Sequence, residues 1–150
     1  MENNLKVLIY ADVDMNLIDG SSIWVTSLIS VLTRSNDIKI TLLLKRPIIR
    51  SILVDPFLDN KQVLLFDPWQ EFKSELSNEK WFETKKLNSE DAVTIIKRLN
   101  KNVKFDVVFI RGLDILMEIG KNEELSAKTW AYITDIPLQT VDYVDKFKHF

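Results

Sequence analysis

The sequence predicts an α/β fold in which helices cover both faces of a parallel β-sheet. Apolar runs of strand length alternate along the chain with segments of helix length, as is typical of parallel sheets. The first run, Leu5–Ala11, is apolar almost throughout, which indicates a strand buried on both faces. A helix-length segment separates it from a second run at residues 38–45, so a right-handed crossover should make the two strands parallel. We expect a Rossmann-like sheet with the strand order 3-2-1-4-5.

The first helix is expected over residues 23–34. Ser21 or Ser22 is suited to cap it, because a serine hydroxyl accepts a hydrogen bond from a backbone N–H that the first turn leaves unsatisfied. An apolar stripe at helical spacing follows, made of Val25, Leu28, Ile29 and Leu32 and widened by Trp24 and Val31. This helix should therefore pack against the sheet over much of its surface.

The later elements are identified by the residues that begin and end them. Pro47 ends the second strand, and Asp55 with Pro56 should break a short helix over residues 48–54. Asn88 or Ser89 can cap a helix, and Gly120 can end another. The remaining strands are expected at residues 62–66, 105–110 and 129–134. The remaining helices are expected after Ser89, at residues 113–119 and 140–150, and in irregular form within residues 69–86.

Length and composition fit one domain with a sizeable core and argue against several classes of site. The chain has 150 residues, of which 46% are hydrophobic, and its formal net charge of -2 gives no field that favours nucleic acid. There is no cysteine and His149 is the only histidine, so thiolate catalysis, a histidine triad and a Cys- or His-based metal site are not expected. Neither a signal peptide nor an apolar run of about 20 residues is present, and we expect a cytoplasmic protein.

Ligands of parallel α/β sheets bind at the carboxyl ends of the strands. The polar residues expected there are Asp12, Asp14, Gly20, Ser21, Ser22, Lys45, Arg46, Asp67, Arg111, Gly112, Thr134 and Asp135. The Gly20-Ser21-Ser22 sequence before a helix can hold a phosphate or a sugar hydroxyl, or it can be only a turn glycine with a capping serine. The G-x-G-x-x-G fingerprint and the P-loop are both absent, which argues against NAD and ATP sites of those kinds.

Charged residues at the strand ends have a functional and a structural interpretation. Asp12 and Asp14 can bind a metal or substrate hydroxyls, or they can be solvated loop acids, the interpretation that we favour for Asp19. Asp12 lies closest to its strand and is assigned to substrate binding. Arg111 either holds an anion or pairs with a carboxylate. Asp135 either contacts substrate or caps the helix that follows it.

The arrangement resembles the N-terminal domain of a GT-B fold glycosyltransferase, of the retaining, family-4-like group that includes many bacterial enzymes of cell-surface polysaccharide biosynthesis. The first strand with its glycine-serine turn, the "D-V-V" strand that begins at Asp106, and the turn at Thr134 and Asp135 are similar to that group. Two positions differ. Ser21 stands where the group often has a second glycine, and Thr134 stands where it often has a histidine.

The resemblance implies transfer of a sugar from a nucleotide-sugar to a glycan, lipid-linked or small-molecule acceptor, with no cofactor or metal. It implies Asp135 as the catalytic residue and Asp12, Gly20, Ser21, Ser22, Arg111 and Thr134 as substrate-binding residues. Residues 1–150 would form the acceptor-side half. Its partner would be a further domain of the same protein that binds the nucleotide-sugar through an E-x7-E motif, and the half alone is not expected to turn over. Peripheral membrane contact of the full-length protein is a further expectation.

Two other classes of protein remain as alternatives. The segment that begins at Asp12-Val13-Asp14 resembles the D-x-D-x-[TV] motif of haloacid-dehalogenase-like phosphatases, in which Asp12 would be the nucleophile, Asp14 the acid/base and Mg²⁺ would lie between them. Asn16 departs from that motif, since it stands where the group has threonine or valine. A non-catalytic, receiver-like module would use Asp12, Asp14 and Asp67, but the fifth strand lacks the lysine that such a module needs.

Overall fold

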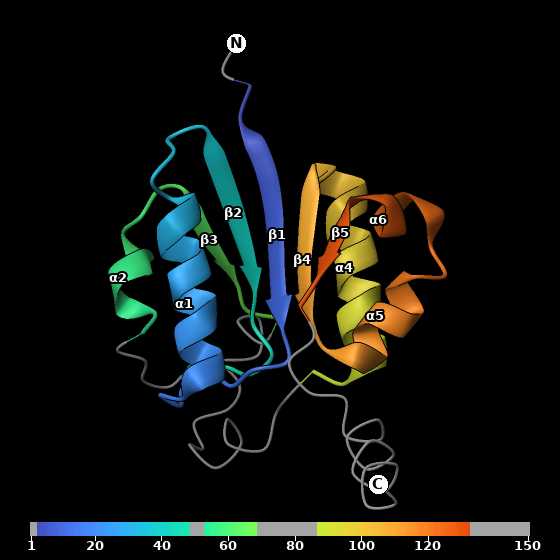
Figure 1. Ribbon diagram of the computed structural model, residues 1–150, viewed down its shortest axis with the longest axis horizontal. Coiled ribbons are helices and arrows are strands. Elements are labelled where there is room, and N and C mark those ends of the chain that lie inside the picture. The colour runs from blue at the N-terminus through green and yellow to red at the C-terminus, as the bar shows by residue number, and fades with distance from the viewer. Residues whose placement is uncertain (1–2, 49–52, 69–86, 133–150) are drawn as a thin grey trace, which may run out of the picture.

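A computed structural model describes residues 3–48, 53–68 and 87–132 of the chain. Its five strands form one parallel sheet in the order β3-β2-β1-β4-β5, which confirms the predicted fold class and strand order. The strands are β1 (Leu5–Ala11), β2 (Ile38–Leu43), β3 (Val63–Phe66), β4 (Val107–Arg111) and β5 (Thr129–Ala131). Figure 1 shows β1 in the middle of the sheet, between β2 and β4.

The central strand β1 is buried on both faces, as its apolar run predicts. Residues 7–11 are all buried, and in the register of the sheet Leu8 lies between Thr41 of β2 and Val108 of β4. Side chains alternate between the two faces of a strand. Leu8 and Tyr10 accordingly belong to one core cluster, and Val7 and Ile9 to the other.

One face of the sheet is covered by α1 (Gly20–Leu32) and α2 (Asp55–Leu58), which lie together on one side in Figure 1. Val25 and Ile29 of α1 are fully buried against this face. The prediction that Val31 widens the apolar stripe is wrong, because its side chain is 57% exposed. Val31 follows Ile29 by two residues, which is about 200° around a helix, so it points away from the sheet.

The other face is covered by α4 (Ser89–Val103), α5 (Leu113–Ile119) and α6 (Glu123–Lys128). Asn88 caps α4 by accepting a hydrogen bond from the N–H of Asp91 at 2.8 Å, and Gly120 ends α5, both as predicted. The helix α6 was not predicted. Its signal was present, because Asn122 is a good capping residue and accepts from the N–H of Leu125 at 3.0 Å.

The predicted bounds of the first helix are wrong, because α1 begins at Gly20 and ends at Leu32. Asp55 and Pro56, which were expected to break a helix, instead begin α2. Pro56 lies in the first turn of α2, where the missing N–H of proline needs no partner. Most of the helix expected over residues 48–54 lies outside the described residues, as do the predictions for residues 69–86 and 140–150.

The fifth strand is shorter than predicted in the described part of the chain. It ends at Ala131, although the N–H of Tyr132 still donates to the carbonyl of Ile110 at 2.9 Å. Residues 133 and 134 lie outside the described residues. None of the helices in the described ranges is long and apolar enough to cross a membrane.

Candidate functional site

The carboxyl ends of β1, β2 and β4 meet at one edge of the sheet, beside the start of α1 (Figure 1). There the N–H of Asp12 donates to the carbonyl of Arg111 at 2.8 Å, which joins the ends of β1 and β4. Gly112 follows with a φ of 143°, a conformation that side chains rarely adopt. A Cβ atom at this position would lie 3.3 Å from the Cβ of Asp12. Glycine thus lets the chain turn closely against Asp12.

The first two carboxylates of the loop after β1 each face a cation from the loop after β2. Lys45 Nζ lies 2.5 Å from Asp12 Oδ1, and Arg46 Nε lies 3.4 Å from Asp14 Oδ2. The side-chain amide of Asn16 donates to Asp14 Oδ1 and to the carbonyl of Pro47, both at 2.9 Å. These contacts fix the two loops to each other.

The pairing of Asp12 and Asp14 bears on the phosphatase alternative. Each carboxylate has a side-chain cation beside it, and the two cations come from neighbouring residues of one loop. In the described ranges, no three His, Cys, Asp or Glu side chains come together as a group that could hold a metal ion. Both carboxylates that the phosphatase alternative would use are thus paired with side-chain cations in this structure.

Asp19 caps α1, and the prediction that Ser21 or Ser22 is the capping residue is wrong. The carboxylate of Asp19 accepts from the N–H groups of Ser21 at 2.9 Å and Ser22 at 2.8 Å. The hydroxyl of Ser22 in turn accepts from the N–H of Asp19 at 3.0 Å, which completes a capping box. Ser22 is fully buried, so its hydroxyl belongs to the cap.

The cap changes the interpretation of the glycine-serine turn. The N–H groups that were expected to hold a phosphate already donate to the carboxylate of Asp19. Gly20 lies in the first turn of α1, and among the described glycines only Gly112 has a positive φ. Gly20 is therefore the first residue of the helix, and the alternative in which it is a turn glycine before a capping serine is wrong.

The carboxylate of Asp19 is ionised at neutral pH. The hydrogen bond from the N–H of Ser22 is the largest cause that lowers the pKa of Asp19. Burial is the second-largest cause and raises this pKa, but the Ser22 hydroxyl, the N–H of Ser21 and the charge of Arg111 lower it further, so the net shift is downward. Asp19 therefore presents a stable negative charge at the start of α1, beside a guanidinium.

Arg111 connects the end of β4 to the start of α1. Its Nη2 donates to the hydroxyl oxygen of Ser21 at 2.8 Å, although the two residues are 90 positions apart in the sequence. We call Asp19, Ser21 and Arg111 the edge cluster. It combines a carboxylate, a hydroxyl and a guanidinium, which are the groups that bind sugar hydroxyls and phosphate oxygens.

The structure brings together some of the predicted site residues. The side chains of Ser21 and Arg111 are in contact. The backbone N–H of Asp12 donates to the carbonyl of Arg111, while the carboxylate of Asp12 pairs with Lys45. Thr134 and Asp135 lie outside the described residues. The binding roles assigned to Asp12, Gly20, Ser21, Ser22 and Arg111, and the catalytic role of Asp135, stay predictions.

Sequence reasoning missed Asp19, which it treated as a solvated acid. The signal was the spacing Asp-x-x-Ser before an apolar helix, a form of capping box. Trp24 lies one helical turn after Ser21 in α1. Its ring stacks on that of Tyr132, with the centroids 4.2 Å apart and an interplanar angle of 11°.

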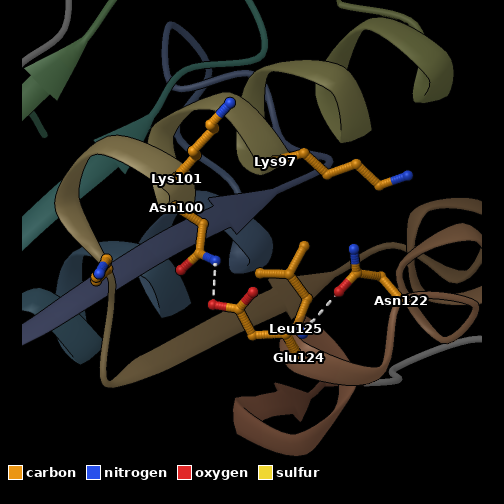
Figure 2. A pocket seen from close by; sticks show the side chains of 7 residues that line it. Lys97, Asn100, Lys101, Asn122, Glu124 and Leu125 are labelled. Carbon is orange, nitrogen blue, oxygen red and sulfur yellow. Dashed lines mark hydrogen bonds between the residues drawn. The ribbon is translucent and has the colours of Figure 1, made fainter.

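A second hollow lies between the end of α4 and the start of α6 (Figure 2). It is lined by Lys97, Asn100, Lys101, Lys104, Asn122, Glu124 and Leu125. The amide of Asn100 donates to Glu124 Oε1 at 3.2 Å, while Lys97 and Lys101 extend away from that contact (Figure 2). The lysines sit near the C-terminus of α4, where they complement the helix dipole. This arrangement fits a helix end better than an anion site.

No protein-family model matches the chain, and neither a curated protein nor a solved structure is significantly similar to it. The structure shows the fold class alone, a Rossmann-like parallel sheet.

Proposed function

We propose that this chain is the acceptor-side half of a GT-B type glycosyltransferase, which transfers a sugar from a nucleotide-sugar to a glycan, lipid-linked or small-molecule acceptor. The observation that carries the proposal is the edge cluster. Arg111 at the end of β4 donates to Ser21 at the start of α1, beside the ionised Asp19. This is the point between β1 and β4 at which the strand order reverses, where open α/β sheets bind ligands.

The chemistry of the edge cluster suits a polyol substrate. A sugar hydroxyl is both a donor and an acceptor, so it can donate to the carboxylate of Asp19 while it accepts from the guanidinium of Arg111. Hydrogen bonds to such charged groups are about twice as strong as those between neutral groups. The cluster thus offers orientation of an acceptor hydroxyl, which is the part of glycosyl transfer expected of an acceptor-side domain.

Arg111 is the positive group of this proposal. The N–H groups of the first turn of α1 are a poorer choice for the diphosphate of the donor, because Asp19 already accepts from them. The guanidinium donates to Ser21 and has a charge that does not titrate at neutral pH. This positive charge would attract a donor phosphate brought in by the second domain.

The test is a transfer assay with the full-length protein, a panel of nucleotide-sugars and a panel of acceptors. Arg111→Gln should lower kcat/KM by about 10- to 100-fold, because a hydrogen bond to a charged group contributes about 1.5–3 kcal/mol and each 1.4 kcal/mol is tenfold. Arg98 of α4 is exposed and lies on the other face, so Arg98→Gln is the matched control and should leave transfer unchanged.

Two results would contradict the proposal. Transfer by Arg111→Gln at the wild-type rate would place the site elsewhere. Release of phosphate from a phosphomonoester that requires Mg²⁺ and is abolished by Asp12→Asn, without any sugar transfer, would favour the phosphatase alternative.

A further inference from the structure

A row of four aromatic side chains begins next to the edge cluster. Trp24 of α1 stacks on Tyr132, which follows β5. Phe109 of β4 and Trp130 of β5 form a second pair, with ring centroids 6.4 Å apart and an interplanar angle of 38°. We call these four residues the aromatic row. It contains two rings from the sheet, one from α1 and one from the segment after β5.

The aromatic row and Arg111 lie on the same face of the sheet. Phe109 and Arg111 are two positions apart on β4, so their side chains leave the strand on the same side. Phe109 packs against the core cluster that contains Val25 and Ile29 of α1, and its partner in the register with β5 is Trp130. The row is therefore on the α1 side and ends at the edge cluster.

Much of this aromatic surface is in contact with water. Trp130 is 66% exposed and Tyr132 is 38% exposed, although large aromatic side chains gain most from burial. An isolated exposed aromatic residue needs no explanation. Here the exposed rings lie beside the carboxylate, hydroxyl and guanidinium of the edge cluster. Aromatic rings next to such polar groups are suited to bind a saccharide.

We propose that the aromatic row is a platform on which a pyranose ring of a saccharide acceptor stacks, while the edge cluster binds hydroxyls of that saccharide. The proposal rests on the proposed function and narrows its acceptor to a saccharide. The C–H groups on one side of a pyranose ring carry partial positive charge and pack against the negative face of an aromatic ring. The hydroxyls at the rim of the sugar then reach Asp19, Ser21 and Arg111.

The test measures saccharide binding by calorimetry and needs no turnover. The probes are neutral linear hexasaccharides of glucose, mannose and galactose, with sorbitol as a control that has the hydroxyls of a sugar without its ring. At least one hexasaccharide should bind and sorbitol should not. Trp130→Ala should weaken binding by about 2- to 10-fold, the equivalent of about 0.5–1.5 kcal/mol for an aromatic contact. Trp130→Phe should recover part of the loss.

The control variant is Met117→Ala on α5. Met117 is 65% exposed, close to the value for Trp130, and α5 covers the opposite face of the sheet. This variant should bind the hexasaccharide as the wild type does. Because both side chains are exposed, circular dichroism should show that both variants keep the wild-type fold and melting temperature within about 2 °C.

Several outcomes would overturn the platform. They are equal binding by Trp130→Ala and wild type, no binding of any hexasaccharide, and tighter binding of uridine monophosphate than of the hexasaccharides with the same dependence on Trp130. A fourth is that Trp130→Ala removes no acrylamide-quenchable fluorescence from the free protein, which would mean that another part of the chain or a second copy covers Trp130. Loss of transfer in the full-length protein with saccharide binding intact would contradict the proposed function and leave the platform standing.

Discussion

Replacing Gly112 by alanine should destabilise the protein, because the backbone there has a conformation that favours glycine. Its φ is 143° and its ψ is 115°. A residue with a side chain held in such a region carries strain of about 1–3 kcal/mol. The new Cβ would also lie 3.3 Å from the Cβ of Asp12, which must move by a few tenths of an ångström, and 3.4 Å from Cδ1 of Ile115, which is van der Waals contact. We expect a loss of about 2–3 kcal/mol in the free energy of unfolding.

The same substitution at Gly20 is the matched control. Gly20 lies in the first turn of α1 without a positive φ, and a Cβ there would have no atom within 4 Å. Gly20→Ala should therefore stabilise the protein by up to about 0.5–1 kcal/mol, because alanine reduces the conformational freedom of the unfolded chain.

Urea denaturation and thermal melting followed by circular dichroism measure both changes. For a chain of this length 1 kcal/mol corresponds to about 2–4 °C, so Gly112→Ala should lower Tm by roughly 4–12 °C and Gly20→Ala should raise it slightly. Equal shifts for the two variants, or a Tm for Gly112→Ala at or above the wild-type value, would refute this account of how β4 turns against Asp12.

Three further predictions concern the cap of α1, metal binding and the activity of the chain alone. Asp19→Ala should lower the free energy of unfolding by about 1 kcal/mol at pH 7. Since the pKa of Asp19 is lower in the folded protein than its ordinary value of 3.8, this difference should be complete above that value and disappear as the pH falls through the folded pKa, as urea denaturation at several pH values would show. Mg²⁺ should not raise the Tm of the wild type, and a rise that Asp12→Asn abolishes would support the phosphatase alternative. The 150-residue chain alone should show no transfer or nucleotide-sugar hydrolysis above background, and turnover by it would count against the two-domain proposal.

The strands and their order could be predicted because their burial is recorded in local sequence. A short apolar run such as Leu5–Ala11 is typical of a strand that is buried on both faces. A helix that connects two parallel strands makes a right-handed crossover, which restricts the strand order. Helix boundaries were harder to predict from the sequence. Asp19, Ser21 and Ser22 are all good capping residues, and only the direction in which the chain enters α1 decides among them.

The location of the candidate site was predictable, but its contacts were not. Arg111 and Ser21 could each be assigned to this edge of the sheet, because Arg111 comes at the carboxyl end of a predicted strand and Ser21 comes at the start of a predicted helix. Their hydrogen bond joins side chains far apart in the sequence and depends on how α1 packs on the sheet. The ion pair between Lys45 and Asp12 likewise joins residues far apart in the sequence. The stack of Trp24 on Tyr132 has the same origin, since it joins a residue of α1 to one that follows β5.

The most direct test of the proposed site is a map of amide chemical shifts in ¹⁵N-labelled protein during titration with the tightest-binding hexasaccharide. We expect the largest shifts at Ser21, Arg111 and Gly112 at the edge of the sheet, and Arg111→Gln should reduce them. Shifts that instead centre on Lys97 and Asn122 in the hollow between α4 and α6, or no shifts at saturating saccharide, would contradict the proposed site.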